Sequence, residues 1–240
     1  METHFSFGPA MIISIIFMAI GMLVSMRLKS KFAKYSNIPS HNGKTGKQIA
    51  EEMLRDHGIY DVKVTSVEGE LTDHYNPFNK TVNLSHGVYQ GANAAAAAVA
   101  AHECGHAVQH AVGYKALDLR SKLVPIQNAS GMIINIIMMA TVFGGAFLFQ
   151  AFPVNLVLMI IVIAYGGIAL FSIVTLPVEF DASKRALAWI EKSGNATAAE
   201  YERSKDALKW AALTYVVAAL GAIATVVYYA AQLLGGRRND

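Results

Sequence analysis

The sequence predicts a mainly helical integral membrane protein with about four transmembrane helices and a smaller polar part of mixed α and β structure. Composition is the first observation, because 15% of the 240 residues are charged, where about 25% is usual. The second is the concentration of apolar residues in four long runs. The third is the helix and strand patterning of the polar segments between them. The single cysteine cannot form a disulfide within the chain, so nothing requires an oxidising compartment.

The four runs contain no Asp, Glu, Lys, Arg or His. They are 19, 19, 23 and 24 residues long and comprise residues 8–26, 131–149, 154–176 and 211–234. About 20 helical residues cross the hydrocarbon core of a bilayer, so each run predicts a transmembrane helix. A signal peptide would have basic residues before the first run and a small-residue cleavage site after it. Here basic residues follow the run directly, from Arg27 onward, so we expect an uncleaved anchor.

Basic residues near the ends of the runs predict the topology, because they mark the cytoplasmic side of a membrane. They follow the first run, precede the second, and lie between the third and fourth. This pattern places the N-terminus outside and both polar segments inside. The chain is therefore expected to consist of an N-terminal transmembrane anchor (1–26), a cytoplasmic part (27–122), a transmembrane hairpin (123–176), cytoplasmic helices (177–210) and a C-terminal transmembrane helix with its tail (211–240).

Helices are predicted in both polar segments. Thr45 and Gln48 resemble a capping box, which predicts a helix over 45–57 that ends at Gly58. The Ala-rich, proline-free stretch 91–112 predicts a long helix. The second segment predicts one or two amphipathic helices interrupted at 193–195.

Strands are expected between these two helices. Residues 62–67 alternate apolar and polar side chains, which is typical of a strand. Residues 71–75 and 81–84 are expected to pair around 76–79, a tetrapeptide rich in turn-forming residues.

The long helix contains the pattern His-Glu-x-x-His at His102, Glu103 and His106. Residues four apart lie about one turn apart on the same helix face, so both imidazoles can reach one zinc ion at about 2.0–2.1 Å. Glu103 lies beside the pair and can accept a proton from the water that the metal activates. The alternative is a pair of histidines with a purely structural role.

A catalytic zinc site needs a third protein ligand and an open position, and that ligand must come from the same side of the membrane. Glu179 meets this condition, because the second and third runs would cross the membrane out and back and so return the chain to the side of His102. Its alternative role is an interfacial carboxylate that caps a helix beginning after Pro177. His86, one loop before the long helix predicted over 91–112, is a competing third ligand.

The motifs AAHECGHAVQ (100–109) and LPVEFDAS (176–183), with DHYNP (73–77) and VNLS (82–85), resemble the YugP-type bacterial membrane zinc metallopeptidases. The resemblance covers most of the chain. It implies a cytoplasmic, gluzincin-like α+β zinc peptidase domain with one Zn²⁺ per chain, held by His102, His106 and Glu179. It also implies a multi-pass protein of the bacterial cell membrane (inner or plasma membrane) with a cytoplasmic active site.

The chain is more distantly similar to the HtpX-like and CAAX-prenyl membrane proteases. In those families an Asp usually follows the ligand Glu by four residues. Ser183 occupies that place here, and Asp181 lies two residues after Glu179. Asp181 is therefore the candidate for a group that supports a zinc-bound histidine.

An extended peptide is expected to add as a strand beside 71–75 or 81–84, which makes Leu71, Asp73 and Val82 residues of the substrate strand. His74 and Tyr75 lie in the same region. Each is either a hydrogen-bond donor to an oxyanion or a solvated strand residue.

Two further residues of interest lie on the long helix predicted over 91–112. His110 is eight residues past His102 and roughly 80° round the helix, so it is expected to be a surface or supporting residue rather than a ligand. The Cys104 side chain points away from the histidine pair and is expected to be a packing residue.

Together these features predict a membrane-embedded, zinc-dependent endopeptidase that acts on protein substrates at the cytoplasmic membrane face, in membrane-protein quality control. Its expected partners are peptide or membrane-protein substrates and the lipid bilayer. The alternative is a non-catalytic zinc-stabilised membrane scaffold or a chaperone. No run contains an ionisable residue, which disfavours a transporter. The basic residues have a topological explanation, so no nucleic acid is expected to bind. The oligomeric state is left open.

Overall fold

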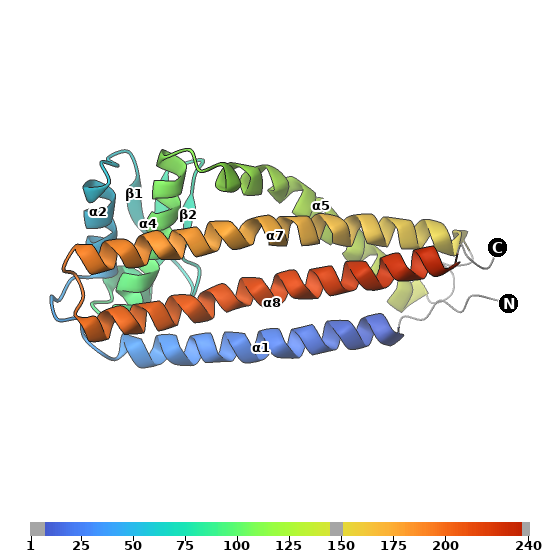
Figure 1. The fold of residues 1–240 in the computed structure, drawn as a ribbon, viewed down its shortest axis with the longest axis horizontal. Coiled ribbons are helices and arrows are strands. Elements are labelled where there is room, and N and C mark those ends of the chain that lie inside the picture. The colour runs from blue at the N-terminus through green and yellow to red at the C-terminus, as the bar shows by residue number, and fades with distance from the viewer. Residues whose placement is uncertain (1–7, 145–150, 237–240) are drawn as a thin grey trace. The chain divides into compact units, whose positions relative to one another are not determined.

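The computed structural model describes residues 8–144 and 151–236 and is mostly helical (Figure 1). The predicted segments 1–26, 123–176 and 211–240 extend in part onto residues 1–7, 145–150 and 237–240, which lie outside the described residues. The helices of the described part are α1 (Gly8–Ser36), α2 (Gly46–Asp56), α3 (His86–Gln90), α4 (Ala94–Ala111), α5 (Lys115–Gly144), α7 (Val154–Lys192) and α8 (Ala198–Gly236). Its strands are β1 (Lys63–Val67), β2 (His74–Asn76) and β3 (Thr81–Ser85).

The chain divides into two compact units. Unit 1 comprises Met1–Met22, Leu119–Thr175 and Tyr215–Asp240, and unit 2 comprises Leu23–Asp118 and Leu176–Thr214. The four apolar runs lie largely in unit 1. Every strand of the described residues and the His-Glu-x-x-His pattern lie in unit 2.

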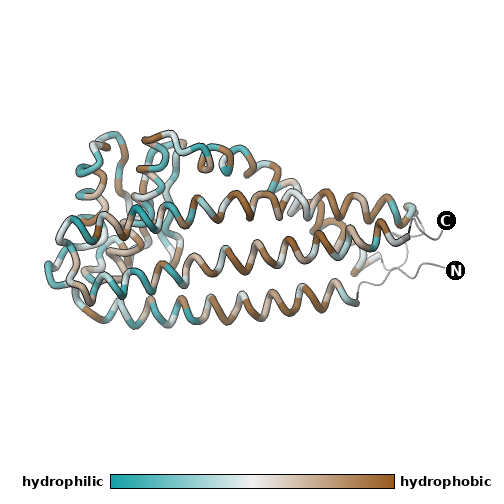
Figure 2. The backbone as a smooth tube through the Cα atoms, viewed as in Figure 1, coloured by the Kyte–Doolittle hydropathy of each residue, from teal (hydrophilic) through white to brown (hydrophobic). Residues whose placement is uncertain are grey.

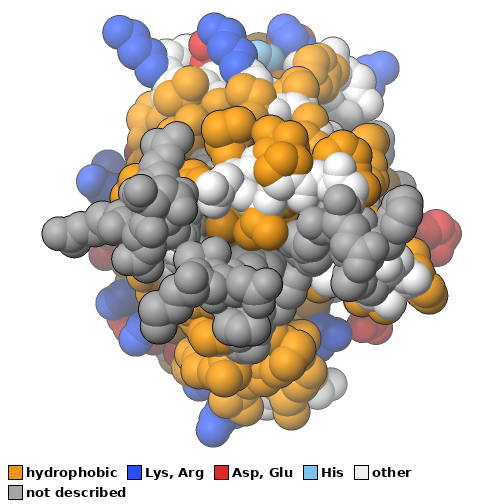
Figure 3. Space-filling view, turned by 90° about the vertical axis from the view of Figure 1, so that its right-hand side faces the viewer, with side chains coloured by type: hydrophobic (Ala, Val, Ile, Leu, Met, Phe, Trp, Pro, Cys, Tyr) orange, Lys and Arg blue, Asp and Glu red, His pale blue; other side chains and the backbone are white. Residues whose placement is uncertain are grey.

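Within residues 8–144 and 151–236, four helices are long and apolar enough to cross a membrane: Pro9–Ser36, Lys115–Gly144, Val154–Lys192 and Ala198–Gly235. Their hydrophobic stretches are visible as brown segments in Figure 2. In Figure 3, hydrophobic side chains (orange) cover much of the described surface that faces the viewer. Large apolar side chains such as Met18 (62%) and Phe143 (78%) are exposed, which is costly in water and favourable in lipid. The predicted set of about four membrane-spanning helices is thus confirmed at the level of length and composition.

Glycines allow close contacts between the helices of unit 1. A Cβ atom at Gly221 of α8 would lie 3.2 Å from the Cβ atom of Phe17 in α1. One at Gly167 of α7 would lie 2.5 Å from the hydroxyl oxygen of Ser130 in α5. Small residues at such positions permit the close helix packing that is common in membranes.

Unit 2 contains a three-stranded sheet in the order β1-β3-β2. β1 runs parallel to β3, while β2 runs antiparallel to it with Tyr75 opposite Val82. The predicted pairing of 71–75 with 81–84 is confirmed in direction, but β2 begins only at His74. Leu71 has a φ of 56°, which an extended strand does not accommodate. β3 is therefore the central strand and β2 an edge strand.

The core of unit 2 joins α2, α4 and the sheet. Its completely enclosed side chains include Met53 of α2, Leu84 of β3 and Cys104 of α4, each 0% exposed. The predicted capping box of α2 is present at Thr45, and Gly58 follows the helix with a φ of 70°. This left-handed residue ends the helix where the sequence predicts.

The long helix predicted over 91–112 is shorter in the structure. The side chain of Asn93 accepts a hydrogen bond from the Ala96 N–H and caps the helix, so α4 begins at Ala94, and residues 86–90 form the separate helix α3.

The predicted interruption at 193–195 is confirmed, since α7 ends at Lys192 and α8 begins at Ala198. Pro177 lies inside α7, so no new helix begins after it.

Candidate metal centre

Helix α4 brings His102 and His106 onto one face. Its alanines pack tightly, with Ala98 and Ala101 both 0% exposed, so neighbouring elements of unit 2 fix the orientation of the helix. The centroids of the two imidazole rings lie 4.8 Å apart. Only 12% of the His102 side chain and 8% of the His106 side chain are exposed. The spacing of the motif therefore produces a buried pair of imidazoles.

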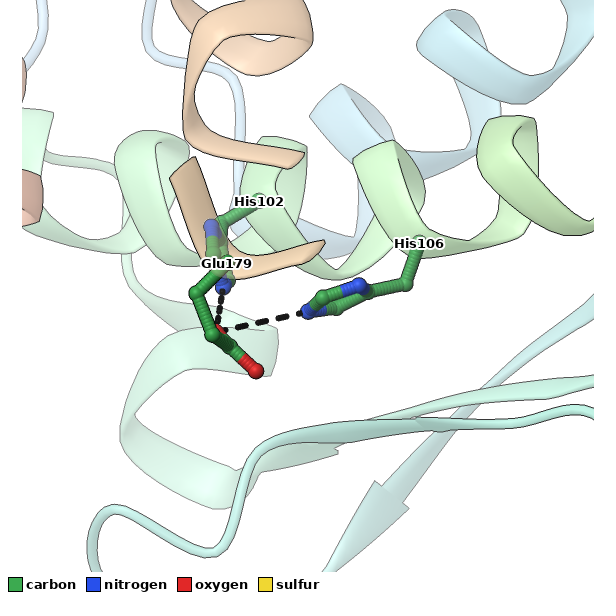
Figure 4. Close-up of side chains that lie close together, drawn as sticks. All are labelled: His102, His106 and Glu179. Carbon is green, nitrogen blue, oxygen red and sulfur yellow. Dashed lines mark hydrogen bonds and ion pairs between the residues drawn. The ribbon is translucent and has the colours of Figure 1, made fainter. Parts of the chain in front are cut away.

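Glu179 of α7 completes the cluster, and Figure 4 shows its side chain directed toward both rings. Its Oε2 atom is 3.3 Å from Nε2 of His102 and 3.6 Å from Nε2 of His106. Among the described residues, these three form the only group of His, Cys, Asp or Glu that could hold a metal ion. Glu179 lies in the interior of α7, so the alternative of a helix-capping carboxylate is wrong. His86 is exposed and outside the cluster.

The donor atoms fit a zinc ion. Two imidazoles and one carboxylate are a ligand set of catalytic zinc sites, which keep the fourth position open. Donor atoms in tetrahedral zinc geometry, with bonds of about 2.0–2.1 Å, are about 3.3 Å apart. The separations of 3.3 and 3.6 Å match this value and exceed the roughly 2.7–2.9 Å of a charge-assisted hydrogen bond. The spacing therefore corresponds better to ligands around a cation than to a direct ion pair.

Gly105 permits the approach of α7 to α4 at this point. A Cβ atom at Gly105 would lie 2.5 Å from the carbonyl oxygen of Ala182 and 3.1 Å from its Cα atom. Both neighbours are backbone atoms that cannot rotate away. Glycine between the two histidines thus allows α7 to carry Glu179 within reach of both.

Glu103 is 7% exposed and lies outside the metal cluster. Its Oε2 atom accepts a hydrogen bond of 2.9 Å from the main-chain N–H of Tyr75. This bond engages Oε2 and leaves Oε1 for a water molecule. The carboxylate is therefore held in one orientation beside the histidines.

Asp181 does not contact a histidine directly. Its Oδ2 atom accepts hydrogen bonds from Nε2 of Gln109 at 2.8 Å and from Nε of Arg185 at 2.6 Å. Gln109 in turn lies with Oε1 3.0 Å from Nδ1 of His106. Asp181 therefore reaches His106 through Gln109, which the sequence did not single out. The available signal was helical spacing, because Gln109 follows His106 by three residues.

Ser183 also supports the cluster. Its hydroxyl oxygen lies 3.1 Å from Nδ1 of His102, and the opposite ring nitrogen faces Glu179. Ser183 is four residues after Glu179 on α7. Both imidazoles of the cluster thus have a polar partner on the nitrogen directed away from Glu179, an arrangement that is usual for metal-ligating histidines.

The predicted substrate strand needs correction. Val82 is 0% exposed and belongs to the central strand β3, whose two edges are occupied by β1 and β2, so it cannot pair with a peptide. Leu71 lies outside any strand. Asp73 accepts hydrogen bonds from the N–H and hydroxyl groups of Ser85, and burial raises its pKa against the effect of these bonds. It fixes the start of β2 rather than facing a ligand. Of the two predicted segments, 71–75 and 81–84, only the first contributes an edge strand, which is β2.

His74 and Tyr75 differ in their surroundings. The His74 ring is exposed, and its Nδ1 donates a hydrogen bond of 2.8 Å to the carbonyl oxygen of Thr72. This favours the solvated-strand interpretation of His74. The hydroxyl of Tyr75 lies 2.7 Å from Nδ1 of His110. Burial, with a smaller effect of Asp61, raises the pKa of Tyr75 to about 12, so the phenol stays neutral.

Cys104 and His110 agree with their predicted roles. The Cys104 thiol is buried and directed to the carbonyl oxygen of Ala50, and burial raises its pKa well above the ordinary value. A neutral thiol that faces away from the cluster is a packing group and not a ligand. His110 is exposed and belongs to no metal cluster among the described residues.

Comparison with known proteins agrees with this geometry. A family model described as "Putative neutral zinc metallopeptidase" matches residues 10–234, a range that includes both histidines, Glu103 and Glu179. The "Putative membrane protease YugP" of Bacillus subtilis (strain 168) is 35% identical over 223 residues, which cover 93% of this chain and 96% of that protein. No solved structure matches the chain. With its four apolar helices, the chain is a membrane protein, and it belongs to this family of zinc metallopeptidases.

Proposed function

We propose that the chain is a membrane-embedded, zinc-dependent endopeptidase that hydrolyses peptide bonds of protein substrates at the cytoplasmic face of the membrane. The observation that carries the proposal is the cluster of His102, His106 and Glu179 with Glu103 held beside it. A site that only clamps two helices needs ligands, but it needs no carboxylate oriented for proton transfer. Glu103 therefore favours an enzyme over a non-catalytic scaffold.

The chain supplies the ligands, the base and the orientation of both. A bound zinc ion provides a Lewis acid that polarises a peptide carbonyl and lowers the pKa of water. Glu103 accepts a proton at Oε1 from the attacking water and returns it to the nitrogen of the leaving amine. Its Oε2 stays bonded to the Tyr75 N–H, which keeps the carboxylate in place during both transfers.

The substrate is placed along the outer edge of β2. Successive residues of an antiparallel strand direct their N–H and C=O groups alternately toward and away from the partner strand. The N–H of Tyr75 points to Glu103, so its carbonyl oxygen also faces away from β3. This oxygen can accept a hydrogen bond from an extended peptide, which brings the peptide main chain beside the base.

The position of Glu179 along α7 suggests the substrate class. Glu179 follows Leu176, the last residue of the third charge-free run, by three residues in the same unbroken helix. A rise of about 1.5 Å per residue puts it about 4.5 Å further along the helix axis. Cleavage this close to the end of a membrane span suits membrane proteins or their cytoplasmic ends. Such substrates are consistent with a role in membrane-protein quality control.

Cysteine labelling tests the cytoplasmic location. Phe78 lies in the turn between β2 and β3 and is 91% exposed, whereas the single native cysteine is buried. In a Cys104→Ala background, Phe78→Cys is expected to react with a membrane-impermeant maleimide only after the cells are permeabilised. Labelling of intact cells would contradict this location.

Cleavage by the purified chain tests the activity. The full chain in detergent is incubated with unfolded casein, with and without a zinc chelator, and the products are mapped by mass spectrometry. We expect internal cleavage that the chelator abolishes and added zinc restores. Zinc binding without cleavage would favour the scaffold, and capture of casein without cleavage would favour a chaperone.

A further inference from the structure

Gln109 joins α4 to α7 beside the metal cluster. It is 0% exposed and follows His106 by three residues. Its Oε1 atom is 3.0 Å from Nδ1 of His106. Its Nε2 atom is 2.8 Å from the carbonyl oxygen of Val178 and 2.8 Å from Oδ2 of Asp181. Both hydrogens of the amide nitrogen and the amide oxygen therefore have partners.

These partners fix which way the amide faces. The carbonyl oxygen of Val178 can only accept a hydrogen bond. The Asp181 carboxylate, which is paired with Arg185, is likewise only an acceptor. Nε2 must therefore face α7, and Oε1 must face His106. An amide oxygen only accepts, so Nδ1 of His106 carries the hydrogen. In the neutral ring, the form that binds a metal, the lone pair is then on Nε2, the atom directed toward Glu179.

The same side chain holds the third ligand. Val178 and Asp181 lie one residue before and two residues after Glu179. Gln109 thus binds α7 on both sides of the ligand, while Gly105 lets the two backbones approach. One residue of α4 consequently influences both the tautomer of His106 and the distance of Glu179 from it.

We propose that Gln109 is a positioning residue of the metal centre, which fixes the Nδ1–H tautomer of His106 and clamps Glu179 at ligand distance. The inference rests on the proposed zinc function and deepens it. Gln109 touches neither metal nor substrate and acts through the two ligands. Groups that support ligands in this way typically influence metal affinity by about 10–100-fold.

The first test is the zinc dissociation constant of the full chain in detergent, measured by competition with a chromogenic chelator. Gln109→Met keeps the length of the side chain but removes its donor and acceptor, and zinc binding is expected to weaken about 10–100-fold. Gln90→Met makes the same change at the exposed end of α3 and should leave the constant unchanged. Cobalt substitution gives a second measurement, because the visible spectrum of bound Co²⁺ reports ligand geometry. That spectrum should change only in Gln109→Met.

A rescue experiment distinguishes positioning from general packing. Gln109→Glu places a carboxylate against Asp181, so zinc binding should weaken. Adding Asp181→Asn restores one amide–carboxylate hydrogen bond with donor and acceptor exchanged, and zinc affinity should recover in part. Unchanged affinity and spectrum in Gln109→Met, or a double variant no better than Gln109→Glu alone, would overturn the inference and leave the proposed function standing. An unsubstituted chain that binds no zinc would overturn both.

Discussion

The main-chain N–H of Tyr75 donates a hydrogen bond of 2.9 Å to Oε2 of Glu103. The two residues are 28 positions apart and belong to the edge strand β2 and the helix α4. One bond thereby connects the proposed catalytic base to the strand along which the substrate is placed. It explains how the carboxylate of a helix residue keeps one orientation next to the proposed metal ligands.

Removal of this N–H should slow catalysis. Tyr75→Pro removes the N–H and the phenol, whereas Tyr75→Ala removes only the phenol. Proline is tolerated on an edge strand where its nitrogen points away from the sheet. A hydrogen bond to a charged group contributes about 1.5–3 kcal/mol, so kcat of the Pro variant should be about 10–100-fold below that of the Ala variant. Equal kcat values at equal zinc content would show that the bond does not orient the base.

Glu179→Gln should abolish tight zinc binding. The side chain is 3% exposed between two imidazoles, and a neutral amide is a poor zinc ligand. A ligand that binds only the folded state stabilises it by about 2.7 kcal/mol at a hundredfold excess over Kd. A chelator should therefore lower the unfolding temperature of the unsubstituted chain and have little effect on Glu179→Gln. The control is Glu191→Gln, at an exposed position of the same helix, which should respond like the unsubstituted chain.

Gly105→Ala should weaken zinc binding without touching a ligand. The new Cβ atom would lie 2.5 Å from the carbonyl oxygen of Ala182, so α7 must move away and take Glu179 with it. Overpacking of this kind costs about 1–3 kcal/mol of folding stability. Gly87→Ala has open space around its Cβ atom and provides the control. Identical zinc dissociation constants for the two variants would mean that the close approach of α7 is not required.

Cys104 should be unreactive in the folded chain. The thiol is 0% exposed, and burial, with a smaller contribution from Glu103, raises its pKa well above 9.0. The stability that depends on a neutral thiol is present below this ordinary value and is lost as the pH rises through the raised one. A maleimide should therefore modify Cys104 only after unfolding, and Cys104→Ala should reduce the loss of stability above about pH 9. Rapid modification of the native protein would contradict the enclosed position of the thiol.

The sequence predicts those features that local patterns determine. The capping box at Thr45 and the left-handed Gly58 depend on neighbouring residues, so both ends of α2 are predictable. The spans follow from run length, and the pairing of His102 with His106 follows from helical spacing. Glu179 could be predicted from the number of membrane spans between it and the histidines and from the family resemblance. Its contact with His102 nevertheless joins residues 77 positions apart.

The remaining features depend on tertiary contacts. Val82 and Tyr75 lie on paired strands, but only the position of β1 on the far side of β3 makes Val82 central and buried. Gln109 lies three residues after His106 in the sequence, yet its role depends on which part of α7 packs against it. Ser183 also lies far from His102 in the sequence, so its contact with that ring is visible only in the folded chain.

The assignment of Glu103 as the catalytic base is tested by peptide cleavage by Glu103→Gln at zinc content equal to that of the unsubstituted chain. Glu103 is not a ligand in this account, so the variant should retain one zinc per chain. Its cleavage rate should fall at least about 100-fold, the lower range for loss of a general acid–base group. Undiminished cleavage with zinc retained would contradict the account, because the base would then have to be another residue.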